Sequence, residues 1–506
     1  MWFLALLLVQ LVQLVLAQCP DYLDYSKERH APYSTGPQQL PYQRPAPACR
    51  TFNSSDVEET IARLKSVIRD PDLARLFENA FPNTLDTAIK WHGSTEELTF
   101  IITGDINAMW LRDSANQLQS YRSLLRPSSQ PDSLAALFRG AINLHARYLL
   151  TAPYCNSFQP PVESAIPPDT NSAAADDTVT PPYSNATVFE CKYELDSLAA
   201  FLQLSADYHA ATNDTAFFGQ HAWARAVDAL LAVVDAMTYS PTYAPDGRPI
   251  SSPYTFSRRT TRATETLANN GLGNPVANGT GLVRSAFRPS DDATLFQLFV
   301  PANMMLAAAL GPAATIAAGI GDADLAEALR ARALALRNAI AQHAVVRAAD
   351  GDGDVYAFEV DGFGSANLMD DANVPSLLSA PFLGFLPRDD PVYQRTRARL
   401  LSDRNPYFMR GPVISAVGGP HQGPGYAWPM ASIMQILTSD DEEEIVRALG
   451  ELLRSTGGLG LIHESVNSFD GNDWTRQWFS WANGLFGQMI LDLETRKPEI
   501  LAMSFQ

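Results

Sequence analysis

Apolar residues along most of the chain recur at spacings of three and four positions, which is typical of helices that bury one face. The segments with this pattern are rich in alanine and leucine and cover residues 112–125, 133–151, 190–211, 215–238, 291–310, 321–344, 426–438, 441–455 and 474–495. Strand-like runs such as 98–103 and 354–360 are too few and scattered for a βαβ repeat. We therefore predict one large, mainly α-helical domain over residues 51–506, made of paired helices.

Between the predicted helices lie long loops rich in glycine, proline and asparagine, among them residues 152–187 and 239–280. Residues 18–50 are rich in proline, tyrosine and glutamine and show little periodicity, so we interpret them as an extended N-terminal arm. The pattern places the polar loops at one end of the helix pairs. Loops carried by a rigid helical scaffold are where binding and catalysis usually occur.

The N-terminus begins with an apolar run that ends in Val15-Leu16-Ala17, which fits a signal peptide over residues 1–17, cleaved after Ala17. An uncleaved signal anchor is the alternative, although Gln10 and Gln13 interrupt the run. We find no later segment that is long and apolar enough to cross a membrane, so we expect a secreted protein without stable membrane insertion.

The cysteines agree with secretion, because an even number without a CxxC pair favours disulfides over a zinc site. The four residues are Cys19, Cys49, Cys155 and Cys191. Three pairings are possible, and Cys19–Cys49 with Cys155–Cys191 is the simplest because each bridge closes a local loop. Four Asn-x-Ser/Thr sequons, typical of glycosylated proteins of the secretory pathway, start at Asn53, Asn185, Asn213 and Asn278.

Composition narrows the function further. The 506 residues contain 46% hydrophobic and 18% charged residues, which is ordinary for a globular protein. The net charge of −18 argues against nucleic acid as a partner, because phosphates require a basic surface. A neutral or cationic substrate is compatible with this charge.

Several segments break the amphipathic pattern because charged and amide residues stand beside aromatic residues and glycine. They are residues 103–117, 287–294, 360–378, 418–430, 461–469 and 475–487. Sugar recognition uses this mixture, since carboxylates and guanidinium groups bond vicinal hydroxyls and aromatic faces cover the C–H faces of the ring. Buried polar networks between helices would explain any one segment, but six in one domain favour a sugar site.

Glycoside hydrolysis typically needs two carboxyl groups, one acid and one base or nucleophile. Glu464 is one candidate, and Asp291 and Asp292 are the others, at the predicted start of a helix. Two adjacent acids repel, which favours a protonated acid, whereas a helix N-terminus stabilises the anion. The sequence does not decide which effect dominates, and helix capping by first-turn acids is the alternative for both aspartates.

Other chemistries are less well supported. The run "DGDGDV" at 350–355 resembles the start of a calcium loop, but Val355 and Asp361 stand where glycine and glutamate are required, so a turn is the better interpretation. The chain has no HExxH, GxSxG, P-loop or dinucleotide-binding motif. We expect no metal and no cofactor.

The polar segments together resemble glycoside hydrolase family 125, the exo-α-1,6-mannosidases. The matching runs are "GDINAMWLRDSANQ", "FRPSDDAT", "FVPANMM", "EVDGFG", "LMDDANVPSLL", "RNPYF", "GGPHQGPGYAWPM", "HESVN" and "WFSWANGLFG". The resemblance extends from about residue 50 to the C-terminus and excludes the arm, the cysteines and the two long loops. It implies an all-α fold, an (α/α)6 barrel whose long loops form the active site at one end.

The resemblance also implies an inverting, metal-independent reaction in which Glu464 is the general base and Asp291 or Asp292 the general acid. It implies that further motif residues hold the terminal mannose. These are Asp105, Trp110, Arg112, Asp113, Arg288, Asp361, Asp371, Asn373, His421, His463 and Trp478.

The function we expect is release of terminal mannose, α-1,6-linked by the resemblance, from mannans or N-glycans. One alternative is an inverting exo-glucosidase on the same scaffold, and the other is a non-catalytic mannose-binding protein. The partner in each case is a glycan.

Overall fold

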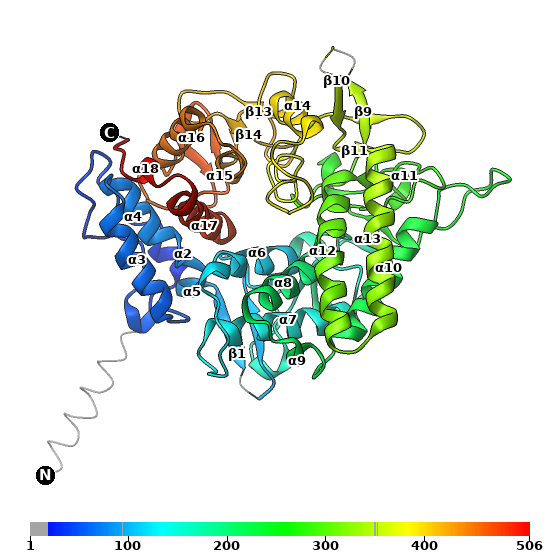
Figure 1. The fold of residues 1–506 in the computed structure, drawn as a ribbon, viewed down its shortest axis with the longest axis horizontal. Coiled ribbons are helices and arrows are strands. Elements are labelled where there is room, and N and C mark those ends of the chain that lie inside the picture. The colour runs from blue at the N-terminus through cyan, green and yellow to red at the C-terminus, as the bar shows by residue number, and fades with distance from the viewer. Residues whose placement is uncertain (1–18, 94, 349–350, 352, 506) are drawn as a thin grey trace, which may run out of the picture.

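Helices follow one another around the molecule in pairs, from the blue N-terminal part to the red C-terminal part of Figure 1. The structure is a computed structural model that describes residues 19–93, 95–348, 351 and 353–505. The expected signal peptide therefore lies outside the described residues. Among the described residues, five helix pairs and a sixth outer helix with an irregular inner partner follow one another around the ring, which confirms the predicted all-α (α/α)6 barrel.

The inner ring consists of helices whose residues are buried almost all round. They are α6 (Leu111–Gln119), α8 (Leu195–Thr212), α12 (Val300–Gly319), α15 (Pro429–Leu437) and α17 (Ser480–Arg496). The remaining inner position, between α13 and α14 in chain order, is taken by the irregular segment 374–386. Pro375 and Pro381 interrupt this segment, and proline removes a donor that a helix needs. The Asp370 carboxylate accepts hydrogen bonds from the N–H groups of Leu377 and Leu378 instead.

Most of the outer helices bury one face and expose the other, as amphipathic sequences predict, and two of them are buried over most of their surface. The outer helices are α3 (Ser55–Val67) with α4 (Pro71–Ala80), α7 (Leu134–Thr151), α10 (Trp223–Tyr239), α13 (Ala323–His343), α14 (Pro391–Leu400) and α16 (Glu442–Arg454). Short helices complete the fold: α2 (Tyr22–Tyr25), α5 (Asn83–Thr87), α9 (Thr215–Phe218), α11 (Ala268–Gly271) and α18 (Pro498–Leu501).

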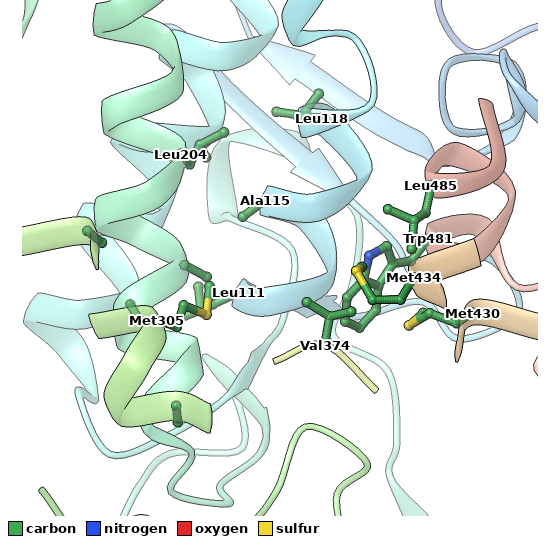
Figure 2. Packing of buried hydrophobic residues seen from close by; sticks show 14 of the residues in the cluster. Leu111, Ala115, Leu118, Leu204, Met305, Val374, Met430, Met434, Trp481 and Leu485 are labelled. Atoms are coloured by element: carbon green, nitrogen blue, oxygen red, sulfur yellow. The ribbon is translucent and has the colours of Figure 1, made fainter. Parts of the chain in front are cut away.

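Apolar side chains from facing inner helices fill the barrel. Figure 2 shows Leu111 of α6 beside Met305 of α12, and Trp481 of α17 beside Met434 of α15 and Val374 of the irregular segment. All five side chains are almost completely buried. The barrel is therefore a packed core with a site at one end and not an open channel.

Short antiparallel strands cluster in the loops. The sheets are β1 (Ile89–Gly93) with β2 (Leu98–Ile101); β3 (Met109–Trp110), β4 (Ser157–Phe158) and β6 (Val188–Glu190); β5 (Thr178–Thr180) with β7 (Thr255–Ser257); β8 (Leu298–Phe299), β11 (Glu359–Val360) and β12 (Ala366–Asn367); β9 (Val345–Ala348) with β10 (Gly353–Tyr356); β13 (Phe408–Met409) with β14 (Ala416–Val417); and β15 (Tyr426–Ala427), β16 (Ser465–Asn467) and β17 (Asp470–Thr475).

Two boundary predictions were wrong in ways that matter for the site. The helix expected at 291–310 begins at Val300, so Asp291 and Asp292 do not stand at a helix N-terminus. The helix expected at 474–495 begins at Ser480, and the residues before it finish strand β17 and then turn. In both places polar residues that face the site had been counted as part of a helix.

Helix α12 corrects the membrane prediction, because it is long and apolar enough to cross a membrane by length and composition. Of its most apolar window, 78% is buried inside the barrel. Core packing therefore accounts for its composition.

The predicted disulfide pairing is confirmed, with Cys19 bonded to Cys49 and Cys155 bonded to Cys191. The first bond closes the N-terminal arm, and the second ties the start of the long loop to the residue after β6. All four sequon asparagines are exposed, so their side chains are accessible for glycosylation.

Candidate active site

The N-terminal ends of the inner helices converge on one pocket. Trp110 directly precedes α6, Trp428 precedes α15 and Phe479 precedes α17. The residues that line the pocket are Thr103, Ile106, Trp110, Arg112, Asp113, Pro289, Ser290, Asp291, Asn373, His421, Trp428, Glu464, Arg476 and Phe479. Helix N-termini carry partial positive charge, so this end of the barrel favours carboxylates and other anions.

Asp291 stands at the tip of a tight turn between the paired residues Phe287 and Ala293. Its backbone N–H donates to the Arg288 carbonyl at 2.9 Å, and the Arg288 N–H donates to the Asp292 carbonyl at 2.8 Å. The turn holds Asp291 at a φ of 63°, in the left-handed region that non-glycine residues rarely adopt. Such conformations cost about 1 kcal/mol or more and concentrate at functional sites.

The Asp291 carboxylate lies among two cations and a buried acid. The Arg112 guanidinium is 3.8 Å from its Oδ1, and the Lys192 ammonium donates to the Asp291 carbonyl at 2.9 Å. The Glu194 carboxyl is a close neighbour of the Asp291 carboxyl, and both lie against the Arg112 guanidinium. Burial by itself raises the pKa of Asp291. Lys192, then Arg112 and Glu194, together lower it by more, so the pKa of Asp291 lies below its usual range.

Glu194 has the opposite character. Its side chain is fully buried, and its Oε2 accepts from Arg112 Nη1 at 2.6 Å. Burial holds the pKa of Glu194 well above its usual range, and the neighbouring Asp291 and Asp196 act in the same direction against Arg112. Asp196, also fully buried and 3.2 Å from Arg112, has its pKa raised to about 6 chiefly by burial. Of these two carboxyl groups, Glu194 is the one that its surroundings favour more strongly in the protonated form.

Asp292 points away from the pocket, although it is adjacent to Asp291 in the chain. It is 1% exposed, and its oxygens lie 3.3 Å from His421 Nδ1 and 3.4 Å from Ser290 Oγ. Burial lowers the pKa of His421, but Asp292, with Glu464 and Asp291, outweighs burial and raises it to about 9. His421 is therefore an imidazolium at neutral pH, and Asp292 is its buried counter-ion.

Glu464 reaches the pocket from the residue just before β16, so the loop predicted around it is followed by a strand. One carboxylate oxygen accepts from Thr475 Oγ1 at 3.0 Å and the other from Arg476 Nη1 at 3.2 Å. Arg476 also pairs with Asp105 at 2.7 Å, and its backbone has a φ of 53°. A second residue of this pocket is thus held in the left-handed region.

Some residues expected to contact sugar lie behind the pocket wall. Arg288 pairs with buried Glu359 at 2.7 Å, Asp371 accepts from Ser290 Oγ at 2.8 Å, and the Asp361 carboxylate accepts from the N–H groups of Phe363 and Ser365. His463 is fully buried and stacks on Trp474. In these places the described structure gives each side chain a protein partner.

Two further expected contacts, Asp105 and Trp478, lie at the edge of a neighbouring cavity. Trp478 is 2% exposed and packs edge-on against Tyr22 of the N-terminal arm. The expected residues that do line the pocket are Trp110, Arg112, Asp113, Asp291, Asn373, His421 and Glu464.

Sequence reasoning missed several residues of the site. Arg476, Trp428 and Phe479 lie within the polar-aromatic segments, where their composition offered a signal. Lys192, Glu194 and Asp196 lie outside those segments, at the start of what looked like an ordinary amphipathic helix. Glu194 directly precedes α8, so it occupies the position that Trp110, Trp428 and Phe479 occupy on their own helices.

Among the described residues, no three histidine, cysteine or acidic side chains are grouped so that they could hold a metal ion. The run at 350–355 contains residues outside the described part of the chain, and Gly353 begins strand β10.

Comparison with known proteins gives consistent results. Residues 70–491 match the family described as metal-independent α-mannosidase (GH125). The chain is 50% identical over 487 residues to the meiotically up-regulated gene 157 protein of Schizosaccharomyces pombe, covering 96% of this chain and 94% of that protein.

A solved structure is also similar. It is a Streptococcus pneumoniae protein from a family of metal-independent α-mannosidases, in a non-productive complex with α-1,6-mannobiose. The TM-score is 0.77 and the identity 33%, over 87% of this chain and 99% of that one.

Proposed function

This chain belongs to the metal-independent α-mannosidase family GH125, and we propose that it is a secreted, inverting exo-α-mannosidase that removes terminal α-1,6-linked mannose. Family membership supports glycoside hydrolase activity on α-mannosides. The observation that carries the mechanistic proposal is that Asp291 and Glu464, from separate segments, line one pocket that also contains two tryptophans.

Asp291 is the general acid in this proposal. Its carboxylate is 29% exposed and lines the pocket, whereas the Asp292 carboxylate is 2% exposed and bonds His421. An acid must reach the glycosidic oxygen within hydrogen-bonding distance. Asp291 then transfers its proton to the leaving oxygen as the C1–O bond breaks.

Glu464 is the general base. Thr475 and Arg476 each donate to one of its oxygens, which fixes the carboxylate plane while leaving lone pairs for a water. Glu464 takes one proton from that water, and the remaining hydroxide forms the new bond to C1 on the face opposite the leaving group. The product is β-mannose, and the carboxyl groups of an inverting pair are expected to be about 6.5–9.5 Å apart.

Glu194 explains how Asp291 can be an acid although Lys192 and Arg112 favour its anion. Two neighbouring carboxyl groups repel when both are ionised, so the pair holds one proton between them. In this proposal the buried Glu194 retains that proton in the resting enzyme and passes it to Asp291, which contacts the same Arg112 guanidinium. Solvent restores the proton after turnover, while Glu464 releases the proton taken from water.

Separate observations support the linkage and the location in this proposal. The Streptococcus pneumoniae relative was solved with α-1,6-mannobiose, which supports α-1,6 linkage as the preferred substrate here. Two disulfides and four exposed sequons fit a protein of the secretory pathway. Mannans and N-glycans are the glycan classes that present such terminal mannose.

The test is linkage-resolved hydrolysis of α-1,2-, α-1,3- and α-1,6-mannobiose, followed by proton NMR of the first product formed. We expect cleavage of the α-1,6 isomer with β-mannose appearing first. Initial release of α-mannose would overturn inversion, and cleavage of glucosides instead would identify an exo-glucosidase. Mannose binding measured by calorimetry without any hydrolysis would identify a non-catalytic binding protein.

A further inference from the structure

A second cavity lies beside the active-site pocket, and we call it the arm cleft. Several segments line it, among them the N-terminal arm at Asp21 and Tyr25, the loop at 104–107, and the long loop at Asp169 and Thr170. Ile106 lines both the arm cleft and the pocket. The two cavities therefore adjoin at the loop end of the barrel.

The partition between the cavities is formed by pairs of touching side chains. Arg476 faces the pocket and bonds Asp105, which faces the arm cleft. Trp110 faces the pocket and packs edge-on against Phe189 of the arm cleft, with ring centroids 5.6 Å apart. The two cavities are therefore separated by no more than one or two layers of side chains.

The arm wall of the cleft is fixed relative to the catalytic residues. The Gln477 side chain donates to the Leu23 carbonyl at 2.6 Å and to Ser26 Oγ at 3.1 Å, and Gln477 follows Arg476 directly. The Cys19–Cys49 disulfide holds the base of the arm. A wall that is already ordered binds a ligand at lower entropic cost than a flexible segment.

We propose that the arm cleft binds the leaving-side sugars of an extended α-mannoside, beyond the sugar next to the bond that is cleaved. This inference rests on the proposed function. An exo-acting pocket holds the terminal sugar, so the rest of the glycan must leave over the rim. The arm precedes residue 70, where the match to the family begins.

The chemistry of the cleft fits neutral sugars. Asp21, Lys90, Asp169 and Thr170 are exposed and line it, and they supply both donors and acceptors for hydroxyl groups. Tyr25 is half-buried and offers part of an aromatic face. The acidic side chains outnumber Lys90 there, which disfavours a phosphorylated or otherwise anionic ligand.

The first test compares kcat/KM of the full-length enzyme for α-1,6-mannobiose and for a linear α-1,6-mannotetraose. We expect kcat/KM for the tetraose to exceed that for the biose by about tenfold, which corresponds to about 1.4 kcal/mol. Equal values for the two substrates would overturn the inference and leave the proposed function intact. Failure to cleave either substrate would instead overturn the proposed function.

The second test fills the arm cleft. In Thr170→Trp we expect the advantage of the tetraose to disappear through a higher KM, with mannobiose kinetics unchanged. Thr178→Trp is the matched control, because Thr178 is exposed on the same long loop and does not line the cleft. Retention of the tetraose advantage in Thr170→Trp, or an equal loss in both variants, would overturn the assignment.

Two more conservative substitutions test whether the N-terminal arm contacts the glycan. Asp21→Asn keeps the oxygen that caps α2 while removing the charge, and Asp24→Asn changes an exposed carboxylate of the same helix outside the cleft. We expect Asp21→Asn alone to reduce the ratio of tetraose to biose kcat/KM. An unchanged ratio would show that the arm does not contact the glycan.

Discussion

The two walls of the pocket hold their carboxylates in different ways. On the wall of Asp291, which we call the acid wall, Lys192 and Arg112 lie among several buried carboxyl groups. The Arg112 guanidinium by itself contacts three of them, those of Glu194, Asp196 and Asp113. On the wall of Glu464, which we call the base wall, the Arg476 guanidinium contacts both Glu464 and Asp105. Each carboxylate oxygen of Glu464 accepts from a donor of its own. The first wall has more carboxyl groups than cations and must hold protons.

The surroundings therefore give Asp291 and Glu464 different roles, acid and base, although both side chains end in a carboxyl group. A surplus of buried carboxyl groups retains a proton, which a general acid needs. A carboxylate held by one guanidinium and one hydroxyl is positioned but keeps free lone pairs, which a general base needs. The predictions below change one wall at a time.

The largest effect is expected on the base wall. Glu464→Gln keeps the shape of the side chain but cannot accept the proton from water, so kcat should fall by about 10³–10⁴-fold. Mannose binding, measured by calorimetry, should change little. Asp473→Asn is the control, since Asp473 bonds Tyr426 and Asn467 nearby but does not line the pocket. Normal turnover in Glu464→Gln would remove it from the mechanism.

On the acid wall, Asp291→Asn should lower kcat on α-1,6-mannobiose by about 10²–10³-fold, because the leaving oxygen is no longer protonated. An activated dinitrophenyl mannoside has a leaving group that needs no protonation, so its hydrolysis should be reduced far less. Asp292→Asn should show no such dependence on the leaving group. The reverse pattern in the two variants would assign the acid to Asp292.

Glu194→Gln tests the shared proton. The variant loses the carboxyl group that retains the shared proton, and Lys192 and Arg112 hold the pKa of the remaining Asp291 below its usual range, so the proton should be lost at lower pH. The alkaline limb of the kcat/KM profile should move by about one unit to lower pH, with about a tenfold loss at neutral pH. The effect should shrink with the dinitrophenyl substrate.

Asp196→Asn is the matched control for Glu194→Gln, because Asp196 is equally buried and also contacts Arg112. A merely structural role for the cluster predicts similar losses in both variants with no movement of the alkaline limb. That result would show that Glu194 does not share a proton with Asp291.

The sequence predicted the helix pairs because their apolar periodicity is a local property, and the resemblance supplied the count of six. It did not predict that Asp291 and Asp292 lie in a turn, because "SDDAT" before an apolar run has the composition of a helix start. The left-handed φ of Asp291 is imposed by tertiary hydrogen bonds that no local pattern encodes.

The choice between the two aspartates also required the fold. Neighbouring residues in a turn point in different directions, and here only Asp291 of the two lines the pocket. Glu194 was missed because nothing near it in sequence marks its role. Its environment is created by Arg112 and Asp291, which lie 82 residues before it and 97 residues after it in the chain.

The smallest expected effect concerns His421, which is influenced by both walls. Its pKa of about 9 in the folded protein lies above the ordinary value of 6.5, because Asp292, Glu464 and Asp291 outweigh burial. The stabilising ion pair with Asp292 is thus fully present below about pH 6.5 and lost as the pH rises through about 9. We expect this loss to cost about 3 kcal/mol of unfolding free energy, or roughly 3 °C in Tm.

Thermal melts between pH 6 and 10 measure this slope. In Asp292→Asn the imidazolium loses its main partner, so the variant should be less stable at pH 7 and its Tm should fall less between pH 7 and 9. Glu464→Gln removes a weaker contribution from the base wall and should flatten the slope only slightly. If the two variants flattened it equally, His421 would belong to the base wall as much as to the acid wall, and the contrast between the walls would be smaller than their contacts indicate.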